Sequence, residues 1–217
     1  MSVLHASPAA RPRTFTHLAL CLALVSLGAC SKPEPPPELP HLGTLPSFAL
    51  TTQRGAAFGE GDFVGKLTAV NFIFTSCPTI CPVIVERTRS VQAALKAASP
   101  RARIVSFSVD PETDTPEVLA KFAAKHGADE SVWTFVTGDA GTLGEAVVHG
   151  FKVAVGERTP RADGAYDILH ASHFVLVDDK AEIRGYYPSD ADGAARLVAA
   201  VAELEKTAKL EKTQGAR

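Results

Sequence analysis

The stretch Leu67-Thr-Ala-Val-Asn-Phe-Ile-Phe-Thr-Ser-Cys77-Pro-Thr-Ile-Cys81-Pro82 decides the fold of this chain. Its first half is a nearly continuous apolar run, which is typical of a strand that is covered on both faces of a sheet. Its second half carries two cysteines and leads into an expected helix. The apolar face of that helix recurs at steps of three and four, at Ile84, Thr88, Val91, Leu95 and Ala98. A strand that passes through paired cysteines into a helix predicts a thioredoxin-like fold.

The remaining chain alternates strand and helix signals around this stretch. Strands are expected at Ile104–Val109, Trp133–Val136, Phe174–Val177 and Ile183–Tyr187, with a hairpin turn at Asp178–Ala181 and a smaller opening hairpin around Arg54-Gly55. Helices are expected after the N-caps Thr115 and Asp139, the latter running through Val148, and from about Asp190. The prediction is an α/β, thioredoxin-like sandwich in which a central mixed β-sheet is flanked by helices.

Residues 1–29 read as a lipoprotein signal peptide. Arg11 and Arg13 precede an apolar segment, Leu18–Leu27, that is short for a membrane span. Leu27-Gly28-Ala29-Cys30 then resembles a bacterial lipobox, in which the signal is cut before a cysteine that becomes lipidated. The alternatives are an ordinary signal peptide with an incidental cysteine and an uncleaved anchor.

The organisation that follows is an exported, membrane-anchored protein. Residues 30–42 contain the lipid-attachment Cys30 and a proline-rich linker, a stiff spacer from the membrane. Residues 43–210 form the folded domain, and residues 211–217 form a polar tail. The domain is expected to face the periplasm or extracytoplasmic space. The net charge of −2 provides no basic field for nucleic acid.

Cysteine use narrows the chemistry. Of the four cysteines, Cys21 lies inside the signal and Cys30 is the lipid site, which leaves Cys77 and Cys81 in the mature body. One close pair in an oxidising compartment predicts a redox or metal pair, because a disulfide scaffold uses more cysteines that are spread more widely. Two buried thiols that act as small apolar side chains are the alternative.

The spacing of the pair favours metal without excluding a disulfide. On a regular helix the Cβ atoms of residues i and i+4 lie about 5–6 Å apart, whereas a disulfide needs about 3.8 Å. Pro78 and Pro82 make irregular backbone plausible, so a reversible disulfide stays open. The amide groups at a helix start favour the thiolate, which is both ligand and nucleophile.

A histidine can complete a site with the two thiolates. His170 and His173 both precede or begin an apolar strand. Residues i and i+3 of an extended segment point to opposite sides, so at most one of the two faces the cysteines. Patterning alone does not choose between them. Two thiolates and one imidazole form a donor set that suits Cu(I).

Three segments together resemble the Sco/SenC family, whose members deliver copper to cytochrome c oxidase. They are Phe72-Ile-Phe-Thr-Ser-Cys77-Pro-Thr-Ile-Cys81-Pro82, Ser108-Val-Asp110-Pro-Glu-Thr-Asp114-Thr-Pro116 and Tyr166-Asp-Ile-Leu-His170-Ala-Ser172. The similarity covers roughly Gly43 to Glu205. The resemblance implies that Cys77, Cys81 and His170 are the copper ligands, and it gives His173 no corresponding role.

Two features need separate interpretation. Many family members have an aspartate directly before the histidine, where this chain has Leu169, and this difference concerns tuning of the histidine rather than its ligation. Asp110 and Asp114 match the family. They have either a conformational role near the site or a role in turn and helix-cap chemistry, and we favour the turn.

The resemblance implies a metallochaperone that delivers copper to, and reduces the thiols of, the binuclear copper site of cytochrome c oxidase subunit II. Other copper chaperones or thiol reductases are further expected partners. Copper would be held as Cu(I), and as Cu(II) where an extra oxygen completes a tetragonal site. The alternative is a thiol–disulfide oxidoreductase for exported proteins, with Cys77 and Cys81 as the redox-active pair; whether the chain is an enzyme stays open.

Two further classes fit less well. A peroxidase needs one reactive cysteine with a nearby arginine such as Arg87, and the paired cysteines and prolines do not match it. A structural zinc site needs four ligands, and three protein ligands do not close it.

Overall fold

The computed structural model describes residues 38–77 and 81–215, except for the side chains of Cys81 and Pro82. A mixed sheet of eight strands lies at its centre, in the order β1-β10-β9-β4-β5-β6-β2-β3. The strands are β1 (Gly43–Thr44), β2 (Ala49–Thr52), β3 (Ala57–Gly59), β4 (Leu67–Ile73), β5 (Ala102–Ser108), β6 (Trp133–Thr137), β9 (His173–Val177) and β10 (Glu182–Pro188). A separate hairpin pairs β7 (Val155–Pro160) with β8 (Tyr166–His170).

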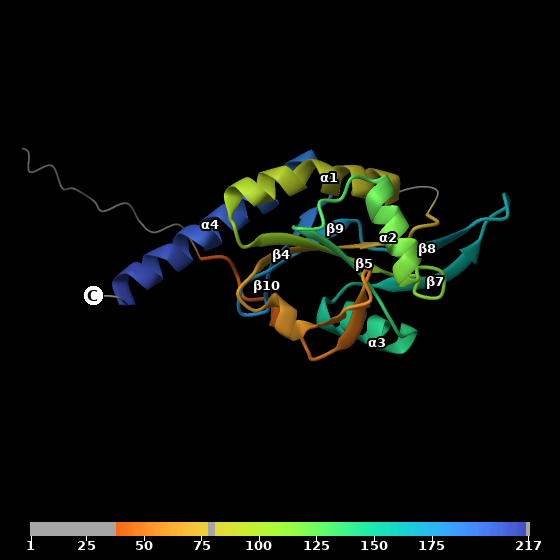
Figure 1. Ribbon diagram of the computed structural model, residues 1–217, viewed down its shortest axis with the longest axis horizontal. Helices are drawn as coiled ribbons and strands as arrows, with labels where there is room; N and C mark the ends of the chain where they lie inside the picture. The colour runs from red at the N-terminus through yellow and green to blue at the C-terminus, as the bar shows by residue number, and fades with distance from the viewer. Residues whose placement is uncertain (1–37, 78–80, 216–217) are drawn as a thin grey trace, which may run out of the picture. The chain divides into compact units, whose positions relative to one another are not determined.

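The sheet is parallel in its middle and antiparallel around it. β4, β5 and β6 run parallel, whereas β9 and β2 pair antiparallel to β4 and β6. The helices are α1 (Cys81–Ala98), α2 (Pro116–Lys125), α3 (Ala140–Glu145) and α4 (Ala191–Gly215), with the short turns η1 (Glu60–Phe63) and η2 (Ala146–Gly150). Helices α1 and α4 lie on one side of the sheet and α3 on the other (Figure 1). The predicted sandwich with a mixed central sheet is confirmed.

Strand β4 is the centre of the core. All seven of its residues are buried, as the apolar run predicted. Phe72 on this strand joins a group of aromatic rings whose closest pair, Phe107 and Phe151, has centroids 4.9 Å apart. Burying a ring of this size stabilises the fold by about 1.5–3 kcal/mol, so β4 and its neighbours form a rigid base for the segment that follows Ile73.

A chain of buried polar groups fixes helix α1 on this base. The Asn71 amide on β4 donates to Thr88 Oγ1 on α1 at 2.6 Å, and its Oδ1 accepts from Ser106 Oγ on β5 at 2.6 Å. Ser106 Oγ accepts from Trp133 Nε1 at 2.8 Å. Thr88, read from the sequence as part of an apolar face, is fully buried and uses its hydroxyl for this contact. These hydrogen bonds fix the rotation of helix α1 about its own axis. Helix α1 begins at Cys81.

The expected starts of the helices after Thr115 and Asp139 are confirmed, and so is the expected turn at Asp178–Ala181. Thr115 Oγ1 caps α2 by accepting from Val118 N, and Asp139 caps α3 by accepting from Thr142 N at 2.9 Å. Helix α3 ends at Glu145, and the π turn η2 continues to Gly150, so the predicted helix through Val148 is split in two. At the β9–β10 turn, the Asp178 carboxylate accepts from the amides at 180 and 182.

The N- and C-terminal ends of the folded domain differ from the predicted bounds. The predicted linker region includes described residues that contact the domain, because Arg184 donates to the carbonyls of Leu39 and Pro40. Helix α4 continues to Gly215, past the expected end at residue 210, and its last turns are exposed. Lysine and glutamate have high helix propensity, so these last turns stay helical although their side chains are exposed. Among the described helices, none is both long enough and apolar enough to cross a bilayer.

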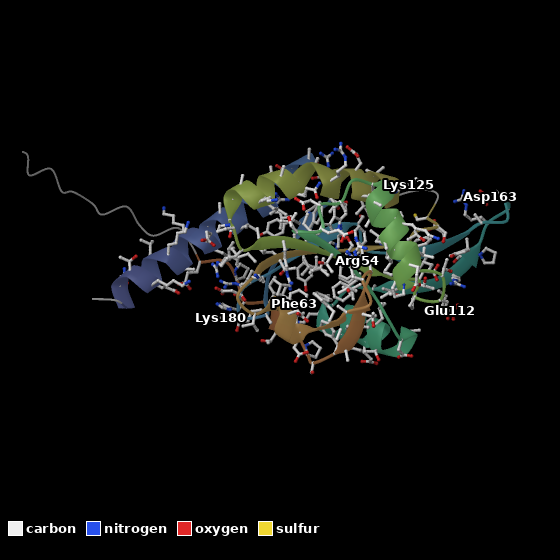
Figure 2. The ribbon with its side chains drawn as sticks, in the orientation of Figure 1. Arg54, Phe63, Glu112, Lys125, Asp163 and Lys180 are labelled. Carbon is white, nitrogen blue, oxygen red and sulfur yellow. The ribbon has the colours of Figure 1, made fainter. Side chains whose placement is uncertain are left out.

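The β7–β8 hairpin was not predicted from the sequence. Strand β7 has exposed residues after the half-buried Val155 and lacks the alternation of a half-buried strand. The turn signal was Asp163-Gly164, where Gly164 has a φ of 81° that suits a hairpin. Asp163 lies at the tip of the hairpin, far from the central sheet (Figure 2). This hairpin carries His170 on its second strand.

The buried polar chain predicts a measurable cost for its central residue. Replacing Asn71 by alanine removes the partner of Ser106 and the donor to Thr88, so the free energy of unfolding should fall by about 1–3 kcal/mol. Denaturant unfolding measures this change. Ser90→Ala removes an exposed hydroxyl on the same helix and should change stability by less than about 0.5 kcal/mol. Equal effects of the two substitutions would contradict this role of Asn71.

Candidate metal centre

Cys77 lies in the loop between β4 and α1. Its side chain is buried, with 7 % exposed, and its amide donates to the carbonyl of Phe74 at 3.3 Å. Positions 78–80 and the side chain of Cys81 lie outside the described residues. Helix α1 begins at Cys81, so the two cysteines do not share one regular helix. The argument from i and i+4 positions on one regular helix therefore does not apply to this pair.

His170 is the last residue of β8 and lies beside the segment that leads to Cys77. Its ring packs edge-on against Phe74, with centroids 5.8 Å apart and an interplanar angle of 85°. Its Nδ1 is 3.1 Å from the carbonyl of Ala171. A carbonyl only accepts hydrogen bonds, so Nδ1 carries the hydrogen and the lone pair is on Nε2. This tautomer suits a metal ligand.

His173 is placed differently. It is the first residue of β9, and its ring packs against Tyr186 at 5.4 Å. Its Nε2 is buried and has no hydrogen-bond partner among the described residues. The two histidines thus contact different aromatic residues, and His170 is the one beside the cysteine loop. Sequence patterning could not choose between the two histidines, because it did not predict the hairpin that brings His170 to Phe74.

The ionisation of both histidines is shifted in the same direction. Burial lowers the pKa of His170, and this effect outweighs the opposing contributions of the Ala171 carbonyl and the Asp167 carboxylate. Burial also lowers the pKa of His173. Asp167 accepts a hydrogen bond from Ile168 N at 3.0 Å, and Leu169, in the position of the family aspartate, is 77 % exposed. The main-chain carbonyl of Ala171 lies at Nδ1 of the His170 ring.

Asp114 is buried against the cysteine loop. Its carboxylate accepts from Thr75 N at 3.1 Å, from Thr75 Oγ1 at 2.5 Å and from Ser108 Oγ at 2.6 Å. Burial raises its pKa despite these hydrogen bonds, which act in the opposite direction. Thr75 is two residues from Cys77, so this carboxylate holds the start of the loop. The prediction that Asp114 serves turn chemistry is therefore wrong for its side chain, which accepts hydrogen bonds from another segment.

Asp110 is buried against the hairpin that carries His170. Its carboxylate, in a residue that is 2 % exposed, accepts from Tyr166 Oη at 2.5 Å and from the Arg158 guanidinium. The turn itself uses the main-chain carbonyl of Asp110, which accepts from the amides at 113 and 114. Asp110 and Asp114 therefore connect the two halves of the candidate site. Sequence reasoning did not predict that Tyr166 and Arg158 contact Asp110. The signal in the sequence was a tyrosine four residues before His170, in a segment that could form a hairpin.

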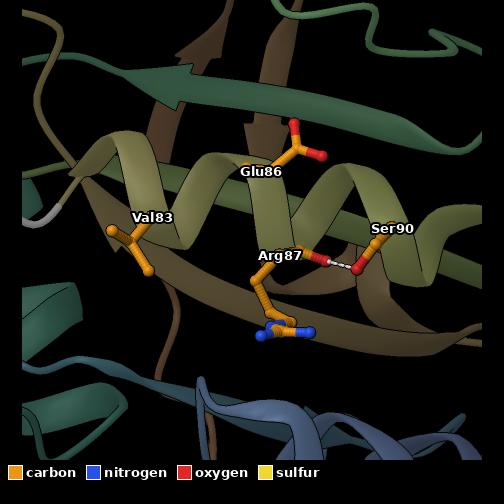
Figure 3. A pocket seen from close by; sticks show the side chains of 4 residues that line it. All are labelled: Val83, Glu86, Arg87 and Ser90. Atoms are coloured by element: carbon orange, nitrogen blue, oxygen red, sulfur yellow. Dashed lines mark hydrogen bonds between the residues drawn. The ribbon is translucent and has the colours of Figure 1, made fainter.

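A pocket of about 430 Å³ lies along α1 and is lined by Val83, Glu86, Arg87 and Ser90 (Figure 3). The Arg87 side chain extends from the helix into this space, and its Nε is buried without a hydrogen-bond partner among the described residues. The described lining contains one carboxylate and no thiol or imidazole.

No group of three metal-ligating side chains forms among the described residues, a set that leaves out the Cys81 side chain. Cys30, Cys21 and the predicted signal also lie outside the described residues. The structure brings together the segment from Phe74 to Cys77 and the strand β8 that ends at His170, and one buried carboxylate bonds each of them: Asp114 bonds Thr75, and Asp110 bonds Tyr166. The thiol of Cys77 and the imidazole of His170 are both donor types that soft metal ions prefer.

Comparison with known proteins identifies consistent relatives. A family model described as SCO1/SenC matches residues 38–206. A SCO1 protein homolog of Bacillus subtilis is 34% identical over 137 residues, which cover 63% of this chain and 69% of the relative. A Stutzerimonas stutzeri protein whose description names copper binding is 25% identical over 171 residues, covering 77% of this chain and 81% of the relative.

Solved structures agree with this result. BsSco, described as a member of the Sco family of cytochrome c oxidase assembly proteins with a disulfide switch, has a TM-score of 0.67 and 29% identity, covering 78% of this chain and 98% of BsSco. A SCO1/SenC family lipoprotein from Bacillus anthracis has a TM-score of 0.66 and 28% identity, covering 75% of this chain and 95% of the lipoprotein.

The lowered pKa of His170 makes a testable statement. An NMR titration should place its pKa below about 6.5, the ordinary value for histidine. The unfolded chain takes up this proton at a higher pH than the native protein, so the contribution of His170 to stability falls as pH drops from about 6.5 toward the native pKa. His170→Gln should remove this part of the pH dependence. A pKa at or above 6.5 would contradict the burial of the ring.

Proposed function

Because the chain belongs to the SCO1/SenC family, we propose that it is a copper metallochaperone whose copper ligands are Cys77, Cys81 and His170. The observation that carries the proposal is the contact of the His170 ring with Phe74, three residues before Cys77. This contact places an imidazole from one hairpin beside the cysteine loop of another segment. The relative whose description names copper binding supports the choice of metal.

The donor set favours Cu(I). Soft thiolates and imidazole select copper in its reduced state, and a three-coordinate S₂N site leaves one side open for ligands of an acceptor protein. The His170 tautomer set by the Ala171 carbonyl supplies Nε2 as the nitrogen donor. Its lowered pKa keeps the imidazole neutral in mildly acidic surroundings, which preserves the ligand. Cu(II) would bind where an additional oxygen completes a tetragonal site.

The target we propose is the binuclear copper site of cytochrome c oxidase subunit II. The likeness to BsSco, described as an oxidase assembly protein, supports assembly of an oxidase as the process. Copper would pass from Cys77, Cys81 and His170 to the target as acceptor ligands replace them one at a time. Copper is then a cargo, and the shallow S₂N site suits its release.

A second candidate function is thiol–disulfide exchange with exported proteins. Cys77 precedes helix α1, which begins at Cys81, so regular helix geometry does not separate the two thiols, and the relative BsSco is described by a disulfide switch. In this exchange the two thiols pass two electrons and two protons to a disulfide of the exported protein, which becomes two thiols, and the S–S bond that forms between Cys77 and Cys81 removes both sulfur ligands. In this proposal copper loading and thiol reduction exclude each other in time.

We further propose that Cys30 anchors the protein to a membrane from the extracytoplasmic side. The likeness to a Bacillus anthracis lipoprotein supports this proposal. A proline-rich spacer of the kind at residues 31–37 would hold the domain away from the bilayer.

Cu(I) titration of the reduced chain from Ser31 to Arg217 against a competing chelator tests the ligand set. The wild-type domain should bind one Cu(I), and His170→Ala and Cys77→Ala should each weaken binding by more than about 100-fold, since a ligand is worth more than an outer partner. His173→Ala is the matched control and should leave the affinity unchanged. Equal losses for the two histidine variants would contradict the ligand assignment, and indifference to His170 would favour the redox function.

The redox coupling is tested by oxidising the same protein before the titration. A disulfide between Cys77 and Cys81 should reduce the number of reactive thiols by two and abolish Cu(I) binding, and reduction should restore both. Copper loading should in turn slow oxidation of the thiols. Full copper binding by the oxidised protein would refute the proposal that the two thiols are the copper ligands.

A further inference from the structure

Tyr166 occupies the junction of the candidate site. Its hydroxyl is 2.5 Å from Asp110 Oδ2, 2.9 Å from Ser76 Oγ and 3.2 Å from Thr113 Oγ1. Asp110 and Thr113 belong to the segment after β5, whereas Ser76 directly precedes Cys77. One phenol hydroxyl on β8 therefore contacts both loops that follow the parallel strands β4 and β5.

The ring of Tyr166 contacts both an aromatic ring and a guanidinium group. It stacks on Phe74 with centroids 6.0 Å apart and an interplanar angle of 18°. The Arg158 guanidinium lies 4.8 Å from the ring centroid and also pairs with the Asp110 carboxylate. Arg158 comes from β7, so the partner strand of the hairpin contacts the same tyrosine and the same carboxylate.

The strand geometry links Tyr166 to His170. Side chains at i, i+2 and i+4 of a strand share one face. Ile168, between the two, is 4 % exposed, and both Tyr166 and His170 contact Phe74, whereas Leu169 on the opposite face is 77 % exposed. The position of Tyr166 therefore determines how the inward face of β8 meets the cysteine loop.

The hydroxyl distinguishes this residue from an apolar wedge. A phenylalanine would reproduce the stacking on Phe74 but would offer no donor to Asp110, whose buried carboxylate requires hydrogen bonds. Arg158 is a second donor to that carboxylate, so loss of the phenol hydroxyl leaves it paired. The fold can therefore survive the loss, while the link from β8 to Ser76 cannot.

We propose that Tyr166 is the positioning residue of the site: its hydroxyl fastens strand β8 to the Cys77 loop and so sets the place of the His170 imidazole. This inference rests on the proposed function in that His170 is taken as a copper ligand. It assigns Tyr166 no contact with the metal. The hydroxyl acts through the strand, and its effect on copper is indirect.

The test compares Tyr166→Phe with Tyr186→Phe in the chain from Ser31 onward. Tyr186 is a half-buried phenol whose hydroxyl donates to the Phe151 carbonyl at 3.1 Å, so the control also loses one phenol hydrogen bond, but on β10. In the metal-free protein, amide hydrogen exchange of residues 166–170 should accelerate by at least about tenfold in Tyr166→Phe and stay unchanged in the control. NMR contacts between the His170 and Phe74 rings should weaken in Tyr166→Phe alone.

Copper measurements provide the second readout. Tyr166→Phe should weaken Cu(I) binding by about tenfold, and X-ray absorption of its copper complex should show a reduced nitrogen contribution beside two sulfurs. Ser76→Ala cuts the same link from the other side and should shift exchange in the same direction, which covers the case in which Tyr166→Phe fails to fold. Wild-type exchange and ring contacts in Tyr166→Phe, or in Ser76→Ala if Tyr166→Phe does not fold, would overturn the inference.

The two proposals fail in different ways. If wild-type protein binds no Cu(I), the proposed function fails, and the metal-free exchange still decides the role of Tyr166. If wild-type protein binds copper through His170 and the Tyr166 variant matches it in exchange, ring contacts and affinity, the inference about Tyr166 fails alone.

Discussion

The burial of two carboxylates where β4 and β5 end is the constraint on which the site depends. A buried carboxylate is tolerated when hydrogen-bond donors surround it, and these donors have to come from other segments. Asp114 takes its donors from Thr75 and Ser108, and Asp110 takes its donors from the β7–β8 hairpin. Parallel neighbours end at one edge of a sheet, so the loops after β4 and β5 are adjacent before any side chain acts. The carboxylates then join the hairpin to that edge.

The two halves of the proposed ligand set are supported by different forces. The cysteine half follows a fully buried strand and leads into a helix whose rotation is fixed by Asn71 and Thr88. The histidine half belongs to a hairpin in which β7 is largely exposed, and which joins the body through Ile168 and the polar contacts of Tyr166 and Arg158. Segments with few buried apolar contacts open at lower free energy than core strands. The histidine is therefore on the more adjustable part.

Sequence reasoning predicted the layers well because they follow from periodicity. The apolar run of β4, the caps Thr115 and Asp139 and the turn at Asp178 are local signals, and each is present in the structure. The hairpin escaped because exposed, charged strands have no apolar alternation. The roles of Asp110 and Asp114 were misjudged for a related reason: a sequence such as Asp-Pro-Glu-Thr-Asp signals a turn, whereas their carboxylates bond Tyr166 and Thr75, which are tens of residues away in the chain.

A histidine on this less deeply packed hairpin agrees with the proposal that copper is a cargo rather than a permanent cofactor. A site that keeps its metal has ligands on rigid elements with satisfied outer partners. Here Nδ1 of the His170 ring faces the carbonyl of Ala171, the residue after β8, and the neighbouring Leu169 side chain is 77 % exposed. The remaining control over His170 then passes through Tyr166, whose hydroxyl reaches the neighbour of Cys77. In the proposed site, copper release and the position of β8 would be coupled through this one side chain.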